Sequence, residues 1–130
     1  MIVGRQNLSS GVKFEKIVGY SRAVRVGIHI FVSGTTGVDY GGESKPSDAY
    51  AQSKKAIENI DSALKKLGGS LRDVVRTRVF IRSDVDWELV ARAHEEFFGS
   101  VLPASTMIAT GFLDSRILVE IEADAIVGEN

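Results

Sequence analysis

Hydrophobic and small residues recur at three- and four-residue steps between positions 49 and 67, the spacing of one face of an α-helix. This apolar stripe consists of Ala49, Ser53, Ala56, Ile57, Ile60, Ala63, Leu64 and Leu67. Ser47 or Asp48 is suited to cap the first turn, and Gly68 is suited to end the last turn in a left-handed conformation. The pattern therefore predicts an amphipathic helix across this region.

A second helical pattern covers residues 85–98, with Asp84 as the expected cap and Gly99 as the expected end. Its predicted apolar stripe is Trp87, Val90, Ala91, His94, Phe97 and Phe98. Because His94 falls on this stripe, we expect a packed core or interface histidine rather than a metal ligand.

Strand patterns occupy much of the remaining chain. Apolar runs at 23–26 and 28–32, separated by Gly27, predict a β-hairpin that ends at Ser33 and Gly34. Residues 34–47 are rich in Gly, Thr, Ser and Asp and predict a loop. Further strands are predicted over 74–82, 106–110 and 118–127.

The element order ββ-α-β-α-ββ predicts an α+β domain with both helices on one face of a mixed sheet. At 130 residues, the chain has the size of a single domain, and we expect one domain over residues 1–130. Alternation within 74–82 places Val75, Thr77, Val79 and Ile81 on the helix-covered face.

The other sheet face is predicted to be charged. Alternation places three arginines of one strand (Arg76, Arg78, Arg82) on it, together with Phe80, and three acids of the last strand (Glu120, Glu122, Asp124). If the two strands are neighbours, opposite charges pair across them. This face is either solvated or packed against other subunits, and a broad uncovered sheet with a phenylalanine on it makes the second arrangement attractive.

Composition excludes several classes of function. The formal net charge of −1 gives no general attraction to nucleic acid or anionic membranes, and no apolar run reaches bilayer-spanning length. The start of the chain lacks a signal-peptide pattern, so we expect a cytoplasmic protein. There is no cysteine, and the two histidines, His29 and His94, form no metal-binding motif. No Ser-His-Asp or phosphate-loop pattern is present, which leaves acid–base chemistry at a carboxylate.

Motifs at residues 19–34, 56–60, 73–81, 96–104 and 119–123 together resemble those of the RidA/YjgF family of small imine-hydrolysing proteins. Residues 19–27 and 30–34 are similar to the opening hairpin of that family, and residues 56–60 to its first helix. Residues 73–81, the run 96–98, the pair Pro103-Ala104 and residues 119–123 are similar to its later motifs in the same order. The resemblance covers roughly residues 17 to 127.

This resemblance implies a chorismate-mutase-like α+β fold, with a mixed six-stranded sheet and two helices on one face. It also implies a homotrimer with three pockets at the subunit interfaces. Deaminating members convert 2-imino or 2-enamino acids to 2-keto acids and ammonia without a cofactor. An arginine after the Pro-Ala pair binds the substrate carboxylate, and a glutamate at the start of the last-strand motif activates the attacking water.

When the family's functional residues are placed on this sequence by position, the resemblance implies that Glu120 is the catalytic residue and that Ser105 replaces the arginine. The other implied ligand-binding residues are Tyr20, Ser33, Gly34, Met107 and Ala91, the last in place of an asparagine. His94 replaces a tyrosine near the pocket. Loss of the guanidinium fork is expected to cost a carboxylate substrate about 2–5 kcal/mol of binding.

Arg22 and Arg78, which replace the usual Gln and Thr of the family, are candidate substitutes for the lost arginine. The simpler expectation is that Arg22 lies on the surface and that Arg78 forms an interface ion pair.

The sequence thus predicts a divergent family member with a small-molecule pocket, hydrolysing an imine, an enamine or a related C–N bond through Glu120. It is not expected to be a standard 2-iminopropanoate deaminase. The rival hypothesis is a non-catalytic protein that binds or senses a metabolite in the same pocket. RNA cleavage is a third possibility, disfavoured by the near-neutral charge and the lack of a stacking platform.

Overall fold

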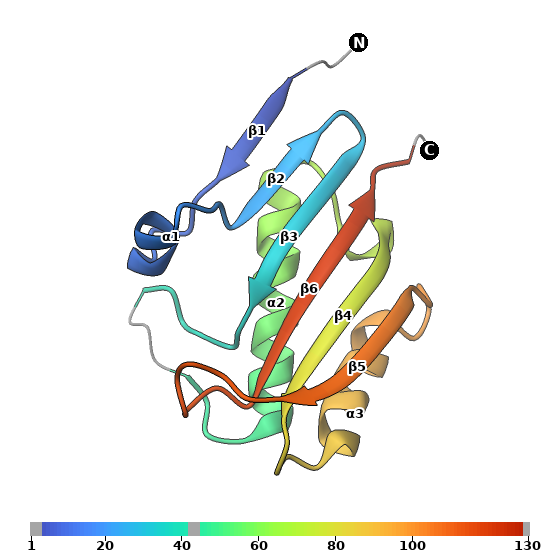
Figure 1. Cartoon of the computed structure of the whole chain (residues 1–130). Helices are drawn as coiled ribbons and strands as arrows, with labels where there is room; N and C mark the ends of the chain where they lie inside the picture. The colour runs from blue at the N-terminus through green and yellow to red at the C-terminus, as the bar shows by residue number, and fades with distance from the viewer. Residues whose placement is uncertain (1–3, 42–44, 129–130) are drawn as a thin grey trace.

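A computed structural model describes residues 4–41 and 45–128. Its centre is a six-stranded sheet in the order β1-β2-β3-β6-β4-β5. The strands are β1 (Arg5–Leu8), β2 (Ala23–Val26), β3 (His29–Thr35), β4 (Val74–Arg82), β5 (Ala104–Thr110) and β6 (Val119–Ile126). The helices are α1 (Lys13–Val18), α2 (Ala49–Lys66) and α3 (Trp87–Phe98), with a short 3₁₀ turn, η1 (Leu71–Asp73). Helices α2 and α3 lie on the same face of the sheet, as the sequence predicts (Figure 1).

The sheet is mixed because β4 and β5 run parallel, whereas all other neighbours are antiparallel. The parallel pair follows from α3, which carries the chain back to the start of the sheet between β4 and β5. The last strand, β6, then inserts between β3 and β4. This insertion places Glu120, Glu122 and Asp124 at the middle of the sheet.

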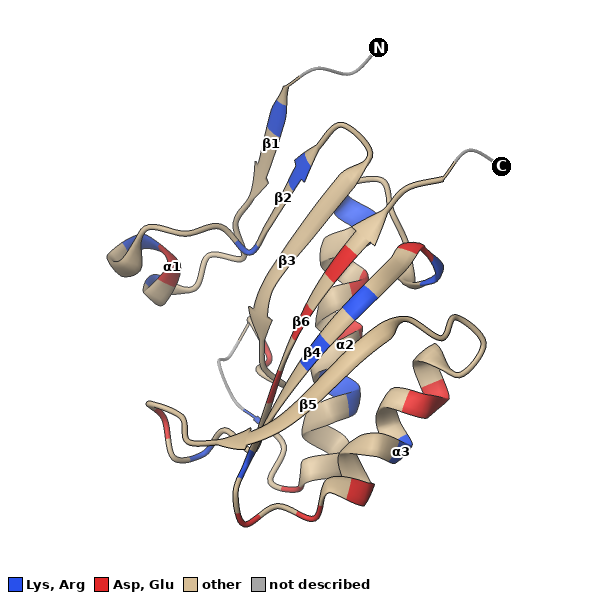
Figure 2. Cartoon of the chain, turned by 45° about the vertical axis from the view of Figure 1, so that its right-hand side comes forward, with Lys and Arg blue, Asp and Glu red and all other residues tan. Residues whose placement is uncertain are grey.

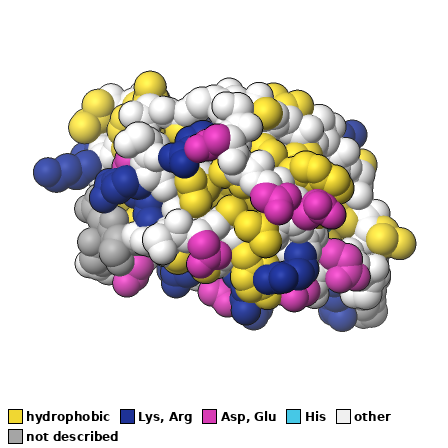
Figure 3. Space-filling model, turned by 90° about the horizontal axis from the view of Figure 1, so that it is seen from below, with side chains coloured by type: hydrophobic (Ala, Val, Ile, Leu, Met, Phe, Trp, Pro, Cys, Tyr) yellow, Lys and Arg dark blue, Asp and Glu magenta, His cyan; other side chains and the backbone are white. Residues whose placement is uncertain are grey.

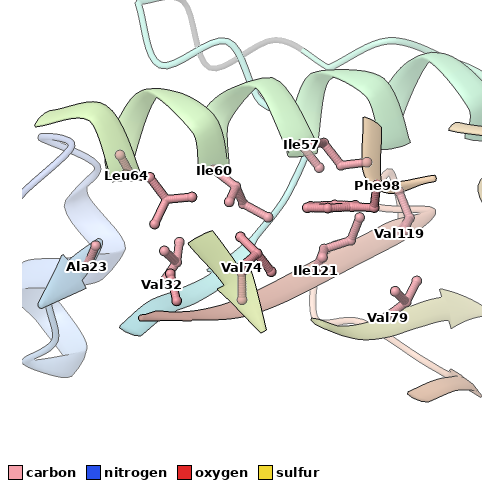
Figure 4. Close-up of a cluster of buried hydrophobic side chains, with 14 of the residues drawn as sticks. Ala23, Val32, Ile57, Ile60, Leu64, Val74, Val79, Phe98, Val119 and Ile121 are labelled. Atoms are coloured by element: carbon pink, nitrogen blue, oxygen red, sulfur yellow. The ribbon is translucent and has the colours of Figure 1, made fainter. Parts of the chain in front are cut away.

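The core lies between α2 and the sheet (Figure 4). Every residue of the predicted α2 stripe is buried, and Ile57, Ile60 and Leu64 are fully buried. They pack against sheet residues such as Val32 and Ile121. The Asp48 side chain accepts a hydrogen bond from the Ala51 N–H at 2.8 Å, and Gly68 has a left-handed φ of +85°. The predicted start and end of this helix are both confirmed.

Helix α3 differs from its prediction in two respects. Asp86, rather than Asp84, caps it by accepting from the Glu88 N–H, because the Asp84 carboxylate is engaged by Arg82 at 2.7 Å. Trp87 is 58% exposed, whereas Ala93, which is not part of the predicted stripe, is buried. Gly99 ends the helix as predicted, in a right-handed conformation (φ −60°).

The strand alternation of β4 is interrupted at its start. The register with β6 shifts between Val74 and Arg76, so Val74 is buried and Val75 is 44% exposed. The prediction that Val75 faces the core is therefore wrong, and the bulge is the reason. Thr77, Val79 and Ile81 are buried as predicted.

Two elements lie outside the predicted set. Strand β1 has exposed, polar residues and is held by its pairing with β2, so it carries no alternating apolar pattern. Helix α1 has six residues and no side-chain cap, which is too short for a periodic stripe. The hairpin, by contrast, forms around Gly27, whose φ is +60°.

The charged sheet face is present (Figure 2). Arg78 lies 3.2 Å from Asp124 and 3.5 Å from Glu122, which confirms pairing between β4 and β6. Arg82 departs from this pattern, since it pairs with Asp84 of the following turn. Phe31 lies on the same face and is 49% exposed.

Candidate functional site

A cavity of about 760 Å³ opens where β3 ends and β6 begins. Helix α1, the chain that follows β3 and the segment between β5 and β6 surround it. Its lining includes Phe14, Tyr20, Arg22, Gly34, Tyr40, Lys45, Phe112, Asp114, Arg116 and Glu120. In Figure 3, which views the molecule from below, hydrophobic side chains lie among basic and acidic ones. A mixed lining of this kind suits a small ligand with both apolar and polar groups.

Glu120 is the half-buried carboxylate of this cavity. Burial raises its pKa, the positive charge of Arg22 partly offsets that rise, and the negative charge of Glu122 adds to it. A carboxylate with a raised pKa is a better proton acceptor than an exposed one. The group is therefore suited to take a proton from a water molecule.

Because Gly34 has no side chain, the Glu120 side chain can lie directly against it. A Cβ built on Gly34 would stand 3.0 Å from the Glu120 Cδ and 3.3 Å from its Cγ, with a carboxylate oxygen nearer still. Both distances are shorter than an ordinary carbon–carbon contact. The β3–β6 register shifts between Val32 and Thr35, and this irregularity brings Gly34 beside Glu120.

Arg22 is buried beside the same cavity, with only 6% of its surface exposed. Its guanidinium donates to the Gly34 carbonyl at 2.7 Å and to the Tyr40 hydroxyl at 3.4 Å, and lies 5.7 Å from the centre of the Tyr20 ring. The expectation that Arg22 lies on the surface is wrong, because the Gly34 carbonyl holds the side chain inward. Arg78, by contrast, forms an ion pair with Asp124 of β6 within the same chain.

Ser105 lies on the opposite, helix-covered side of the sheet. Its Oγ accepts a hydrogen bond from the Thr77 hydroxyl at 2.8 Å, and the Thr77 oxygen is 2.9 Å from His94 Nε2. Thr77 is completely buried, and burial lowers the pKa of His94. His94 is thus neutral at neutral pH and takes part in a hydrogen-bonded chain that ends at an exposed hydroxyl.

The remaining predicted residues do not all line the Glu120 cavity. Tyr20 and Gly34 line the cavity, whereas Met107 packs against the core from β5. Ala91 lies on α3, three residues before His94. The Ser33 hydroxyl donates to the Ser21 carbonyl at 2.7 Å, and Ser33 lines a second, neighbouring cavity that also includes Tyr20 rather than the Glu120 cavity. One chain therefore brings Tyr20, Gly34 and Glu120 together and leaves Ser105, Met107 and Ala91 elsewhere.

Sequence reasoning missed a second charged group at the cavity. Asp114 pairs with Arg116 at 2.7 Å and with Lys45 at 3.5 Å, and the Arg116 hydrogen bonds hold the Asp114 pKa well below its usual range. These residues come from loops without periodicity. The only sequence signal is the short spacing of Asp114 and Arg116.

Within the described ranges, no three His, Asp or Glu side chains are placed to hold a metal ion together. No helix in this part of the chain has the length and apolarity needed to cross a bilayer.

The model of the family described as Endoribonuclease L-PSP matches residues 11–127, so the chain belongs to the RidA/YjgF family. A YjgF/YER057c/UK114-family protein from Mycobacterium tuberculosis is 40% identical, with a TM-score of 0.87 over 95% of this chain and all of the other. The fold is the chorismate-mutase-like α+β fold of that family.

Two further relatives have similar coverage. A RutC family protein from Pyrococcus abyssi is 36% identical over 87% of this chain and 91% of its own length. The 2-iminobutanoate/2-iminopropanoate deaminase of Mus musculus is 33% identical over 84% of this chain and 82% of its own.

Proposed function

We propose that this protein hydrolyses the C–N bond of a small imine or enamine, with Glu120 as the catalytic residue. The observation that carries the proposal is a half-buried carboxylate of raised pKa that lines a ligand-sized cavity. The similarity to a 2-iminobutanoate/2-iminopropanoate deaminase supports the reaction class.

In the proposed reaction, the Glu120 carboxylate takes a proton from water while the water oxygen adds to the imine carbon. Glu120 passes this proton to the imine nitrogen, and the product of addition is a neutral carbinolamine. Glu120 then takes the proton of the carbinolamine hydroxyl and delivers it to the nitrogen as the C–N bond breaks, so that ammonia leaves and a carbonyl product remains. Each proton taken is given back, so the cycle needs no cofactor.

We propose further that the site is completed in a homotrimer. Ser105, Met107 and Ala91 do not line the Glu120 cavity of their own chain. In a trimer, these residues of one subunit would face the cavity of the next. The exposed Phe31 and Val26 on the uncovered sheet face support such an assembly, since large apolar side chains gather at subunit interfaces. Light scattering should give about three times the chain mass of 14.1 kDa, and a clean monomer would contradict this part of the proposal.

The proposed substrate is not a simple 2-imino acid such as 2-iminopropanoate. Ser105 offers one hydroxyl where the family's deaminating members present an arginine, so a small carboxylate would not be fixed in the usual orientation. The cavity of about 760 Å³ also leaves room for a larger molecule.

The test is a panel of imines, generated in place by an amino acid oxidase from substrates of increasing size. Their disappearance is followed with semicarbazide as a carbonyl trap. We expect the wild type to accelerate at least one large imine, and Glu120→Gln to abolish that acceleration. Glu58→Gln, an exposed glutamate on α2, is the matched control and should retain activity.

A wild type that accelerates no imine but binds small molecules in the cavity would favour the alternative, a non-catalytic metabolite-binding protein. Equal rates in the wild type and Glu120→Gln would remove Glu120 from the mechanism.

A further inference from the structure

Arg22 differs from the other two cations that line the cavity. Lys45 and Arg116 both pair with Asp114. Arg22 has no carboxylate within ion-pair distance in the described part of the chain, although it is the most deeply buried of the three. The electrostatic effect of Arg22 on Glu120 lowers the pKa of Glu120 but does not amount to an ion pair.

The hydrogen-bonding capacity of Arg22 is also incompletely used. A guanidinium has five N–H donors. Among the described residues, its acceptors are the Gly34 carbonyl and, at a long 3.4 Å, the Tyr40 hydroxyl. The Nε–H is buried and has no partner there. A buried charge with unused donors costs free energy unless a further group satisfies it.

We propose that Arg22 binds a carboxylate group of the substrate beside Glu120. This inference rests on the ligand pocket of the proposed function. The substrate class is then an imine or enamine that carries a carboxylate at a distance set by the Arg22–Glu120 separation. Arg22 and Glu120 line the same cavity of one chain, so one chain would hold the anion and supply the catalytic carboxylate. Ser105 lies on the other side of the sheet and takes no part in this contact within that chain.

A carboxylate fits this position better than a neutral polar group does. It accepts two parallel hydrogen bonds from a guanidinium and supplies the missing negative charge. Tyr20 and Phe14 stand at the same cavity and offer apolar surface for the rest of the ligand. The competing interpretation is that Arg22 only holds the Gly34 carbonyl in place. A glutamine at position 22 can still donate a hydrogen bond to the Gly34 carbonyl but carries no charge, so Arg22→Gln separates the structural role of Arg22 from its charge.

The experiment is an NMR titration of the full chain that follows the Arg22 Nε–H resonance. The probes are pyruvate, 2-oxobutanoate and benzoate, each compared with its neutral amide. We expect the carboxylates to shift this resonance and to bind at least about tenfold more tightly than the amides, as a charge-assisted pair does.

Arg22→Gln should remove the preference for carboxylates and leave amide binding unchanged, whereas Arg22→Lys should keep part of it. Arg72→Gln, at an exposed position on η1, is the control for loss of one positive charge and should behave as the wild type. Melting temperature and assembly state, measured on each variant, separate misfolding from loss of the anion contact.

The inference is overturned if carboxylates and amides bind equally, if no carboxylate binds up to its solubility limit, or if Arg22→Gln retains the preference. These results are distinct from failure of the proposed function. Imine hydrolysis that survives in Glu120→Gln would remove the catalytic proposal and leave the anion contact intact. Loss of hydrolysis in that variant, without any carboxylate preference in the wild type, would overturn the anion contact alone.

Discussion

Replacing Gly34 with alanine tests the position of Glu120 without changing any charge. The added Cβ would stand 3.0 Å from the Glu120 Cδ, whereas two carbon atoms in contact need about 3.5–4.0 Å. The Glu120 carboxyl carbon must therefore retreat by about 0.5–1 Å, and its nearer oxygen by more.

The expected effect on stability is small. The obstructing atoms belong to the end of a flexible side chain, and Gly34 is not among the glycines with positive φ, so alanine introduces no backbone strain. The free energy of unfolding should stay within about 1 kcal/mol of the wild type. Displacement of a reacting group by this distance costs on the order of 10²-fold in rate.

The assay is the semicarbazide-coupled hydrolysis of the best imine of the panel, with kcat and KM measured separately. Gly128→Ala is the matched control, because an added Cβ there meets nothing within 4 Å and Gly128 follows the end of β6 opposite to Glu120. Gly34→Ala should lose kcat while Gly128→Ala keeps it. A Gly34→Ala protein that retains full kcat would show that the reaction does not depend on the position of Glu120.

Three further predictions follow from individual side chains. Because burial raises the Glu120 pKa, the folded state binds the Glu120 proton more tightly than the unfolded state does, and stability falls as pH rises from the unfolded-state pKa through the folded-state pKa. Glu120→Gln should therefore raise the melting temperature at pH 7.5, and equal melting curves would refute this. Burial lowers the pKa of His94, so the unfolded state binds a proton at a higher pH than the folded state does, and the wild type loses stability as pH falls below about 6.5. His94→Asn should reduce this acid sensitivity in urea titrations. Ser105→Arg should increase 2-iminopropanoate hydrolysis by at least about tenfold if it restores part of a 2–5 kcal/mol contact, and a folded trimer with no gain would favour the binding-protein alternative.

The parts of the fold that the sequence predicts well are those with a buried stripe. Helix α2 repeats its apolar residues along its whole length, and β6 alternates strictly, so the hydrophobic pattern alone identifies both elements. Strand β1 and helix α1 escape notice because pairing with β2 and local hydrogen bonds hold them, not a hydrophobic pattern. The Val75 bulge is equally invisible, since it shifts the face of a residue without changing its type.

The candidate site is predicted in part. Tyr20, Gly34 and Glu120 come from motifs of the family, and they line one cavity. The burial of Arg22 depends on the Gly34 carbonyl 12 positions away, and the Asp114 cluster joins loops far apart in sequence. Periodicity carries no information about such contacts. The separation of Ser105 from Glu120 is a property of the sheet topology, and it appears only once β6 is placed between β3 and β4.

The pH dependence of imine hydrolysis tests the catalytic role of Glu120 most directly. Glu120 acts as a base, so kcat/KM should fall as pH drops through its pKa, and this acid limb should lie above the usual carboxyl range because burial raises that pKa. Glu122→Gln should move the limb to lower pH, since the Glu122 charge contributes to the rise. Glu120→Gln should lose the limb together with the activity. An acid limb that persists in Glu120→Gln, or that stays in place in Glu122→Gln, would contradict the assignment of Glu120 as the base.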